Sequence, residues 1–186
     1  VVYRGTGSSQ SINHNLGAAP EMMWVKNISS SANWSVYHKD LPSSGILRLN
    51  QNVANQTGDG PYIFGNDSTL VAPTNTVFTV GGADGTSNTS GSDYIIYLFA
   101  SLDGIAKVGS YTGNGGTSVT GTGQNIDCGF SGGARFVMVK PINAADNWFI
   151  YDTQRGISDQ YEESVSFNLT NGESSGSDEI DPLSSG

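Results

Sequence analysis

The 186-residue chain has little of the chemistry on which most active sites depend. It contains one cysteine, two histidines and only eight basic residues against 17 acidic ones, which gives a net charge of −9. The single Cys128 cannot form an intrachain disulfide, so cysteine usage does not indicate the compartment. The shortage of Lys and Arg disfavours nucleic acid as a partner, because binding a phosphate backbone relies on clustered basic side chains.

Long apolar runs are also missing from the sequence. None reaches the roughly 18 residues that a membrane span requires, and the acidic balance disfavours docking on an anionic membrane surface. We therefore expect no membrane insertion. No signal peptide is recognisable, and the chain starts at Val1 rather than Met, which predicts a processed or excised start.

What the chain does contain in quantity is small polar residues. Gly, Ser, Thr and Asn supply 80 of the 186 residues. Gly and Asn break helices, and Ser and Thr compete for backbone hydrogen bonds, so long helices are not expected. Short apolar runs separated by turn-rich sequence are typical of an all-β protein, and 18 aromatic residues argue against disorder.

Four blocks of sequence occur twice in the same order. They are "VYRGTGSSQSI" and "SYTGNGGTSV", "LGAAPEMMWVK" and "FSGGARFVMVK", "NWSVYHK" and "NWFIYDT", and "LRLNQN" and "VSFNLT". The second and third blocks recur at an interval of 114 residues, and a small insertion precedes the fourth. Four blocks in one order indicate a duplication.

Each copy predicts a β-hairpin followed by a third strand. The hairpin strands are expected at Met22–Lys26 and Trp34–Tyr37, and again at Phe136–Lys140 and Trp148–Tyr151. In the fourth block, apolar residues alternate with polar ones, which predicts that one face is buried. These apolar residues are Leu47 and Leu49 in the first copy and Val165 and Phe167 in the second.

The first copy continues with two further apolar runs, 76–80 and 93–102. The second run would also suit a buried helix, but its β-branched and aromatic content favours a central sandwich strand. We therefore expect two β-sandwich domains in tandem: 1–102, a linker at 103–109, and 110–186. The second domain has no counterpart of either run, so either the polypeptide continues past it or another chain supplies the strands.

One motif matches an enzyme signature. Gly129–Gly133 reads G-x-S-x-G, the nucleophile elbow of α/β-hydrolases, which requires a preceding strand, a following helix and a later histidine. A predicted strand follows instead, and no histidine occurs after His38. We interpret the motif as a glycine-rich turn.

Other candidate sites are equally weak. His14 and His38 have no second metal ligand at a recognisable spacing. The carboxylate pairs Glu162–Glu163 and Asp178–Glu179 could serve a glycosidase, but neighbouring residues on a strand point to opposite faces. Acidic clusters at 58–60, 65–67 and 178–181 offer oxygens for a structural Ca²⁺ without EF-hand spacing. We predict no catalytic residues, no bound metal at a defined site and no enzymatic activity.

The repeated tryptophans are the strongest binding candidates. A Trp can stack on a sugar ring, which makes Trp34, Tyr37, Trp148 and Tyr151 candidate ligand-binding residues. The same residues could instead pack under their own hairpins. Both copies keep Trp-x-x-Tyr while the residues after it differ, which favours packing. We therefore expect any recognition to use exposed loops such as 81–93.

The second copy resembles a known family. The stretches "YIIYLFASLDGIAKVGSYTGNG", "ARFVMVK" and "NWFIYDTQRG" are similar to a repeated β-domain of unassigned function in tail-fibre and other structural proteins of tailed phages, marine cyanophages included. The similarity runs from about residue 94 to Gly186, whereas the first copy lacks the "YDT-RG" ending. The resemblance implies a jelly-roll or concanavalin-like sandwich, whose closing strand would lie beyond the second copy.

The resemblance also implies a function. The chain would be a virion protein, in a tail fibre or a capsid decoration, located in the extracellular particle and contributing to host attachment. We expect a homo-oligomer, with a trimer favoured. Expected partners are other virion proteins and host surface glycans. No cofactor is expected, and a structural Ca²⁺ is left open as an alternative. The alternatives are a carbohydrate-binding adhesin module and a polysaccharide depolymerase.

Overall fold

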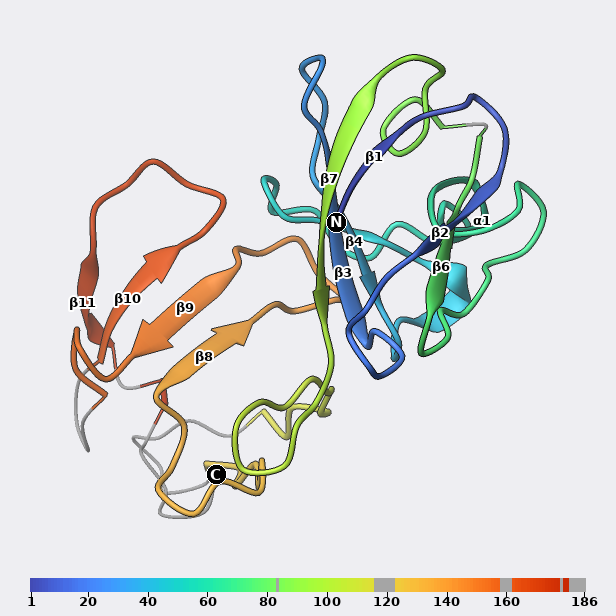
Figure 1. Cartoon of the computed structure of the whole chain (residues 1–186). Coiled ribbons are helices and arrows are strands. Elements are labelled where there is room, and N and C mark those ends of the chain that lie inside the picture. Colours follow the sequence, from blue (N-terminus) through green and yellow to red (C-terminus); the bar gives the residue numbers. More distant parts are fainter. Residues whose placement is uncertain (83, 116–122, 158–161, 178, 181–186) are drawn as a thin grey trace. The chain divides into compact units, whose positions relative to one another are not determined.

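The regular secondary structure among the described residues consists mainly of antiparallel β-sheets (Figure 1). The computed structural model describes residues 1–82, 84–115, 123–157, 162–177, 179 and 180. Within these residues the helical elements are one short α-helix, α1 (Gly60–Ile63), and one 3₁₀ turn (Pro42–Ser44). No described helix has the length and hydropathy to cross a membrane. The prediction of an all-β protein is confirmed.

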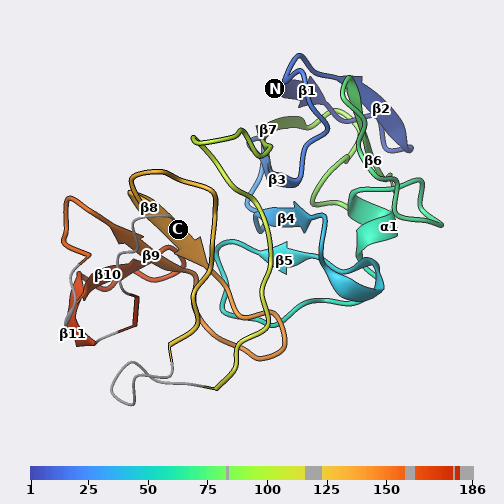
Figure 2. The same ribbon diagram turned by 90° about the horizontal axis from the view of Figure 1, so that it is seen from below.

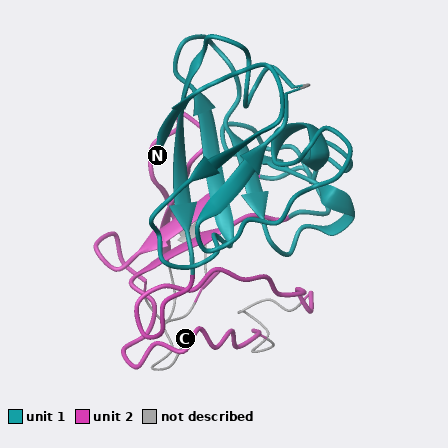
Figure 3. Ribbon diagram, turned by 45° about the vertical axis from the view of Figure 1, so that its right-hand side comes forward, with its two compact units in different colours: residues 1–100, 142–146 teal, residues 101–141, 147–186 magenta. Residues whose placement is uncertain are grey.

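Residue contacts divide the chain into two compact units (Figure 3). Unit 1 consists of Val1–Ala100 and Ile142–Asp146, and unit 2 of Ser101–Pro141 and Asn147–Gly186. The short second segment of unit 1 is held by a hydrogen bond from the Asn55 N–H to the Ile142 carbonyl at 2.9 Å. The predicted limits of two tandem domains stay a prediction.

Unit 1 is built on a five-stranded antiparallel sheet (Figures 1 and 2). Its strands, in spatial order, are β1 (Val2–Arg4), β7 (Asp93–Phe99), β3 (Met22–Asn27), β4 (Ser35–His38) and β5 (Leu47–Arg48). The apolar run that predicted a central strand forms β7, which pairs with β1 on one side and β3 on the other.

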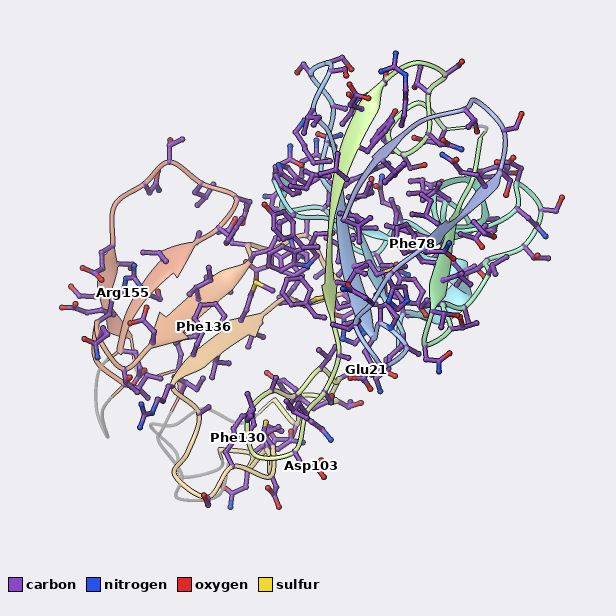
Figure 4. The ribbon with its side chains drawn as sticks, viewed as in Figure 1. Glu21, Phe78, Asp103, Phe130, Phe136 and Arg155 are labelled. Atoms are coloured by element: carbon purple, nitrogen blue, oxygen red, sulfur yellow. The ribbon has the colours of Figure 1, made fainter. Side chains whose placement is uncertain are left out.

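A second, two-stranded sheet completes unit 1. It pairs β2 (Gln10–Asn13) with β6 (Val77–Val80) in an antiparallel register from Gln10↔Val80 to Asn13↔Val77. The hydrophobic core contains residues of both sheets and of α1, including Phe78 of β6 (Figure 4). The run 76–80 thus forms a strand, as predicted.

The core of unit 1 follows from strand periodicity. Side chains alternate between the two faces of a strand, and on β3 the alternate residues Met23 and Val25 are fully buried. On the neighbouring β7, Tyr94 and Ile96 are buried in the same core cluster. Tyr3 of β1 stacks on Tyr94 with 5.1 Å between ring centroids. Three adjacent strands therefore cover the core with one continuous apolar face.

Unit 2 contains one four-stranded antiparallel sheet among its described residues (Figure 1). Its strands are β8 (Phe136–Val139), β9 (Phe149–Asp152), β10 (Glu162–Ser166) and β11 (Ser174–Ser177), in the order β11-β10-β9-β8. The pairing of β10 with β11 contains a register shift between Glu162 and Ser164.

The duplication seen in the sequence is repeated in the backbone pairing. Hairpin β8–β9 reproduces the register of hairpin β3–β4 at every paired position. The pairs Met22↔His38, Met23↔Tyr37, Trp24↔Val36 and Val25↔Ser35 correspond to Phe136↔Asp152, Val137↔Tyr151, Met138↔Ile150 and Val139↔Phe149. The third strands also match, since Val36↔Leu47 corresponds to Ile150↔Val165. The two copies share a three-stranded unit of identical register.

The predicted burial of the third strand holds in one copy only. In unit 1, Leu47 and Leu49 are buried as expected, but Arg48 between them is buried as well. In unit 2 the expectation is wrong for Phe167, which is 48% exposed. Phe167 lies just after the end of β10, and the described part of unit 2 has no second sheet to cover that face.

Candidate functional site

The four predicted binding residues do not form one site. Trp34 and Tyr37 belong to unit 1, and Trp148 and Tyr151 belong to unit 2. Trp34 is half-buried, whereas the other three side chains are at most 6% exposed. Residues three apart on an extended strand point to opposite faces, so the Trp-x-x-Tyr phrase does not place its two rings side by side.

The repeated Asn-Trp phrase forms a hydrogen-bonded clip in unit 1. Asn50, which follows β5, accepts the Trp34 backbone N–H through its side-chain oxygen at 2.9 Å. Its side-chain nitrogen donates to the Asn33 side-chain oxygen, also at 2.9 Å. The Leu49 N–H donates to the Trp34 carbonyl at 3.2 Å. The clip ties the start of β4 to the end of β5.

Unit 2 builds the same clip atom for atom. The Asn168 side-chain oxygen accepts the Trp148 N–H at 2.9 Å, and its nitrogen donates to the Asn147 side-chain oxygen at 2.9 Å. The Phe167 N–H donates to the Trp148 carbonyl at 2.9 Å. The Asn-Trp sequence is therefore repeated because, in each three-stranded unit, Asn side chains hydrogen-bond the start of the second strand to the end of the third. No ligand is required to explain its recurrence.

The clip of unit 2 should contribute more to stability than that of unit 1. We expect Asn168→Ala to lower the free energy of unfolding by about 1–3 kcal/mol, because it removes two partly buried hydrogen bonds. Asn50→Ala removes two solvent-exposed ones and should cost less. Urea denaturation of both variants makes the comparison. A larger loss for Asn50→Ala would contradict it.

One candidate ligand surface remains, on the face of the unit 1 sheet opposite the core. Trp34 stacks on Tyr97 with ring centroids 6.2 Å apart and planes at 27°, and Tyr97 is 47% exposed. Next to them, Trp24 contacts Phe99 at 4.6 Å between centroids. We call Trp24, Trp34, Tyr97 and Phe99 the outer aromatic face. Flat, partly exposed rings of this kind can stack on a planar or sugar-like ligand.

The predicted recognition loop 81–93 is not an exposed surface throughout, which corrects the expectation. Ser87 and Asn88 are fully buried. The Tyr3 hydroxyl donates to the Ser87 carbonyl at 2.6 Å, and the Asn88 side-chain oxygen accepts the Thr6 N–H at 2.9 Å. The loop folds back against the chain that follows β1, because its polar groups supply hydrogen bonds to that backbone.

Both histidines take part in local turns. The His14 Nδ1 accepts the Leu16 N–H at 3.2 Å, and its Nε2 lies 3.1 Å from the Thr74 carbonyl oxygen. The His38 Nδ1 accepts the Asp40 N–H at 3.2 Å. These are the contacts of loop residues that stabilise backbone turns.

The G-x-S-x-G stretch is a turn whose two end glycines both have positive φ. Gly129 has φ +76° and Gly133 has φ +73°, a backbone region that favours glycine. The next regular element is strand β8 rather than a helix. The strand–turn–helix context of a nucleophile elbow is therefore not formed here.

A buried carboxylate in unit 2 was not recognised from the sequence. Glu162 is 2% exposed, and its Oε2 accepts the N–H groups of Glu179 at 2.7 Å and Ile180 at 3.2 Å. Its Oε1 has no hydrogen-bond partner within the described residues. The Tyr151 hydroxyl donates to Glu179. The sequence signal that could have revealed this buried residue was the Glu162–Glu163 pair on a strand, since neighbouring side chains point to opposite faces and one of the two must face inward.

The acidic clusters expected to attract Ca²⁺ have other contacts where they are described. Asp59 lies 4.0 Å from the Arg48 guanidinium, and the Asp67 carboxylate accepts the Gly82 N–H at 2.8 Å. Asp178 and Asp181 lie outside the described residues. Among the residues that are described, no three His, Cys, Asp or Glu side chains gather as a metal site would require.

Arg48 is a second buried polar residue that the alternating pattern did not predict. Its Nε donates to Gln56 at 2.7 Å, and one terminal nitrogen donates to the Ser35 hydroxyl at 2.5 Å. Burial lowers the pKa of the guanidinium, while Asp84 and Asp59 act in the opposite direction. The contacts join β4, β5 and the loop before α1, so Arg48 braces unit 1.

Buried tyrosines predict a loss of stability at alkaline pH. Burial raises the pKa of Tyr3, and the nearby Tyr94 adds to the effect. Burial also raises the pKa of Tyr37, reinforced by Asp40, and that of Tyr151, reinforced by Glu179. A raised folded-state pKa leaves stability intact below the unfolded value of about 10 and removes it as the pH rises further, by about 1.4 kcal/mol per pH unit for one group.

The measurement is urea denaturation between neutral pH and the onset of phenol ionisation. We expect a flat profile up to about pH 10 and a steep fall above it. Tyr3→Phe should reduce the slope of the fall, at the cost of the hydrogen bond to Ser87. A profile that declines well below that pH would contradict the prediction.

Together these features define an all-β protein built on a duplicated three-stranded unit. Residues 1–186 match the family described as a domain of unknown function (DUF7483), and the chain belongs to that family. The match spans both copies of the unit, so the family domain includes the duplication. No curated protein and no solved structure matches the chain.

Proposed function

We propose that this protein is a non-enzymatic structural component of a phage virion, in a tail fibre or a capsid decoration. The observation that carries the proposal is the three-stranded unit built twice with one register and one Asn clip. Both copies keep the three-stranded unit, while the residues at its strand ends differ. This combination suits a scaffold that presents variable surfaces. The proposed location of the protein, in the phage particle, rests on the sequence resemblance to phage structural proteins.

The proposal extends to fold and assembly. We propose that the sheets belong to tandem jelly-roll or concanavalin-like sandwiches, and that the protein assembles as a homo-oligomer with a trimer favoured. Its other partners would be neighbouring virion proteins. The acidic surface is compatible with an extracellular particle, and a structural Ca²⁺ would be detected as a melting temperature that falls on chelation.

The absence of an enzymatic role is part of the proposal. Its support is that both histidines stabilise local turns and that the serine motif forms a glycine turn before a strand. General acid–base and nucleophilic chemistry need such groups placed within reach of one another and of a substrate.

The test is the composition of the particle. Virions purified through a density gradient should contain this protein in a fixed stoichiometric ratio to the major capsid protein, measured by quantitative mass spectrometry. Immunogold labelling should place it at fibres or on the capsid surface. Its absence from purified particles, despite its presence in the lysate, would overturn the proposal.

A carbohydrate-binding adhesin module is the second candidate, favoured by the outer aromatic face. Stacking on an exposed aromatic is worth about 1–3 kcal/mol for a nucleobase, and a sugar ring should be comparable. A glycan array probed with the purified protein should then show binding that Tyr97→Ala removes. The buried Tyr37 provides the matched control, because Tyr37→Phe should leave binding intact. A depolymerase would instead release new reducing ends from host polysaccharide.

A further inference from the structure

Strand β8 lies at the end of its sheet, although its counterpart in the other copy lies inside one. In unit 1, β3 has β4 on one side and β7 on the other. The β3–β7 pairing runs over six residue pairs, from Met22↔Phe99 to Asn27↔Tyr94. In unit 2, β8 pairs with β9 and has no neighbour on its other edge among the described residues. At this edge of the repeated three-stranded unit, the copies therefore differ by the strand β7.

The hydrogen-bond ladder shows which backbone groups of β8 face this open edge. The Thr153 N–H donates to the Arg135 carbonyl at 3.1 Å, which makes these two residues a hydrogen-bonded pair. Such pairs alternate along an antiparallel ladder. Val137 and Val139 therefore also direct their backbone groups toward β9, whereas Phe136 and Met138 direct theirs away from it.

Strand β3 of unit 1 shows the same alternation, and there the corresponding edge is paired with β7. The Lys39 N–H donates to the Glu21 carbonyl at 2.9 Å, the equivalent of the bond between Thr153 and Arg135. On the other side of β3, the Ile28 N–H donates to the Asp93 carbonyl at 2.9 Å, so even-numbered residues of β3 face β7. Trp24, the counterpart of Met138, is one of them. The alternation is interrupted just before β3, where the Glu21 N–H donates to the Phe99 carbonyl at 2.8 Å.

The side chains of β8 are also more exposed than those of β3. Met23 and Val25 of β3 are completely buried, whereas their counterparts Val137 and Val139 are only partly buried. Phe136 is 60% exposed and stands at the start of β8 (Figure 4). In unit 1, these positions have a neighbouring strand, β7, that has no counterpart among the described residues of unit 2.

Strand β8 is short and is flanked by Arg135, Lys140 and Pro141, but its own four residues carry none of the features that disrupt pairing along an edge. Natural edge strands carry charges, proline or bulges that prevent pairing. The four residues of β8, Phe136–Val139, are all uncharged and apolar, and their register with β9 is unbroken. A regular, apolar edge of this kind is a template for an added strand.

We propose that the open edge of β8 is a binding site for an antiparallel β-strand with the alternating aromatic and aliphatic sequence of β7, supplied by another polypeptide. The register is that of unit 1: Phe136, Val137, Met138 and Val139 face the positions of Phe99, Leu98, Tyr97 and Ile96. This inference depends on the duplication and is independent of whether the protein is part of a virion.

Two strands of the 186-residue sequence are less suited to the edge. The chain's own β7 is not available, because it is paired on both sides, with β1 and β3. A second copy could pair its β8 with this one, but that would bring Val and Met side chains together. It would not supply the two rings that the positions of Tyr97 and Phe99 would add.

The probe is a fluorescent peptide with the sequence of residues 93–101, DYIIYLFAS, titrated with the full chain and followed by fluorescence anisotropy. We expect saturable binding. Met138→Pro removes the outward N–H and should weaken binding by about tenfold or more. Met138→Ala keeps that N–H and should bind much more tightly than Met138→Pro. Proline is tolerated where a strand N–H faces solvent, so the circular dichroism spectrum of Met138→Pro should match that of the native protein.

Modified peptides provide a test that needs no protein variant. N-methylation at the positions of Tyr97 and Phe99 blocks the groups that would face β8 and should abolish binding. N-methylation at Ile96 and Leu98 blocks groups that point away and should preserve it. Equal binding of the two peptides, or no saturable binding by the native peptide, would overturn the proposal. So would a dimer of the free chain that Met138→Pro dissociates, because a second copy would then fill the edge.

Discussion

Replacing Trp148 with alanine is expected to lower the free energy of unfolding of unit 2 by about 3–5 kcal/mol. The indole is 3% exposed, so truncation removes a large buried apolar surface and leaves a cavity. Its backbone is also fixed by hydrogen bonds to Asn168 and Phe167, which limits how far the chain can collapse into the space. Differential scanning calorimetry should show a lowered transition, and an unchanged melting temperature would disprove the packing role.

The duplication provides a matched control at Trp34. Its backbone has the same clip, but its ring is half-buried and stacks on the exposed Tyr97. Trp34→Ala should therefore cost about 1–2 kcal/mol, in proportion to the smaller area removed from water. If both substitutions lowered the free energy of unfolding equally, the difference in burial between the two tryptophans would have no effect on stability.

The parts of the fold that could be predicted are those with a local signal. The apolar run 93–102 contains more β-branched and aromatic residues than a helix favours, and it forms β7. The hairpins were recognisable because turn-rich segments separate their strands, and the structure forms β3–β4 and β8–β9 there. The ends of the hairpin strands differ from the expected ones by one residue, and β7 ends at Phe99, three residues before the end of the apolar run.

The burial of polar residues could not be predicted in the same way. Arg48 alternates with Leu47 and Leu49, so strand periodicity assigns it to the solvent face. It is buried because Ser35 and Gln56, from two other segments, accept its hydrogen bonds. Asn88 is buried for a similar reason, since its partners follow β1. Such contacts join residues far apart in sequence and leave no local pattern.

The candidate site shows a further limit of sequence reasoning. Repetition of Trp-x-x-Tyr indicated a conserved frame, and the frame is indeed repeated to the level of single hydrogen bonds. The environment of each ring is not repeated, however, because Trp34 has Tyr97 of β7 beside it and the described sheet of unit 2 contains no corresponding strand. A duplicated sequence thus preserves backbone register more faithfully than side-chain surroundings.

Strand β7, which has no counterpart in the described sheet of unit 2, also contains the residue with the second large expected effect. Tyr94 of β7 is completely buried and stacks on Tyr3. Its hydroxyl accepts the Thr89 N–H at 2.8 Å and the Asn27 side-chain amide at 3.1 Å. It also donates to the Gly85 carbonyl at 3.2 Å. One side chain therefore joins the core to the loop before β7.

We expect Tyr94→Ala to lower the free energy of unfolding of unit 1 by about 5 kcal/mol, at the upper end for truncating a buried aromatic, because it also removes the acceptor of one buried and one partly buried hydrogen bond. Tyr94→Phe keeps the ring stack and should cost about 1–3 kcal/mol, for the unsatisfied groups alone. Urea denaturation of both variants separates packing from hydrogen bonding. If Tyr94→Phe were as damaging as Tyr94→Ala, the hydroxyl and its three partners would hold unit 1 together, and the aromatic stack would contribute little.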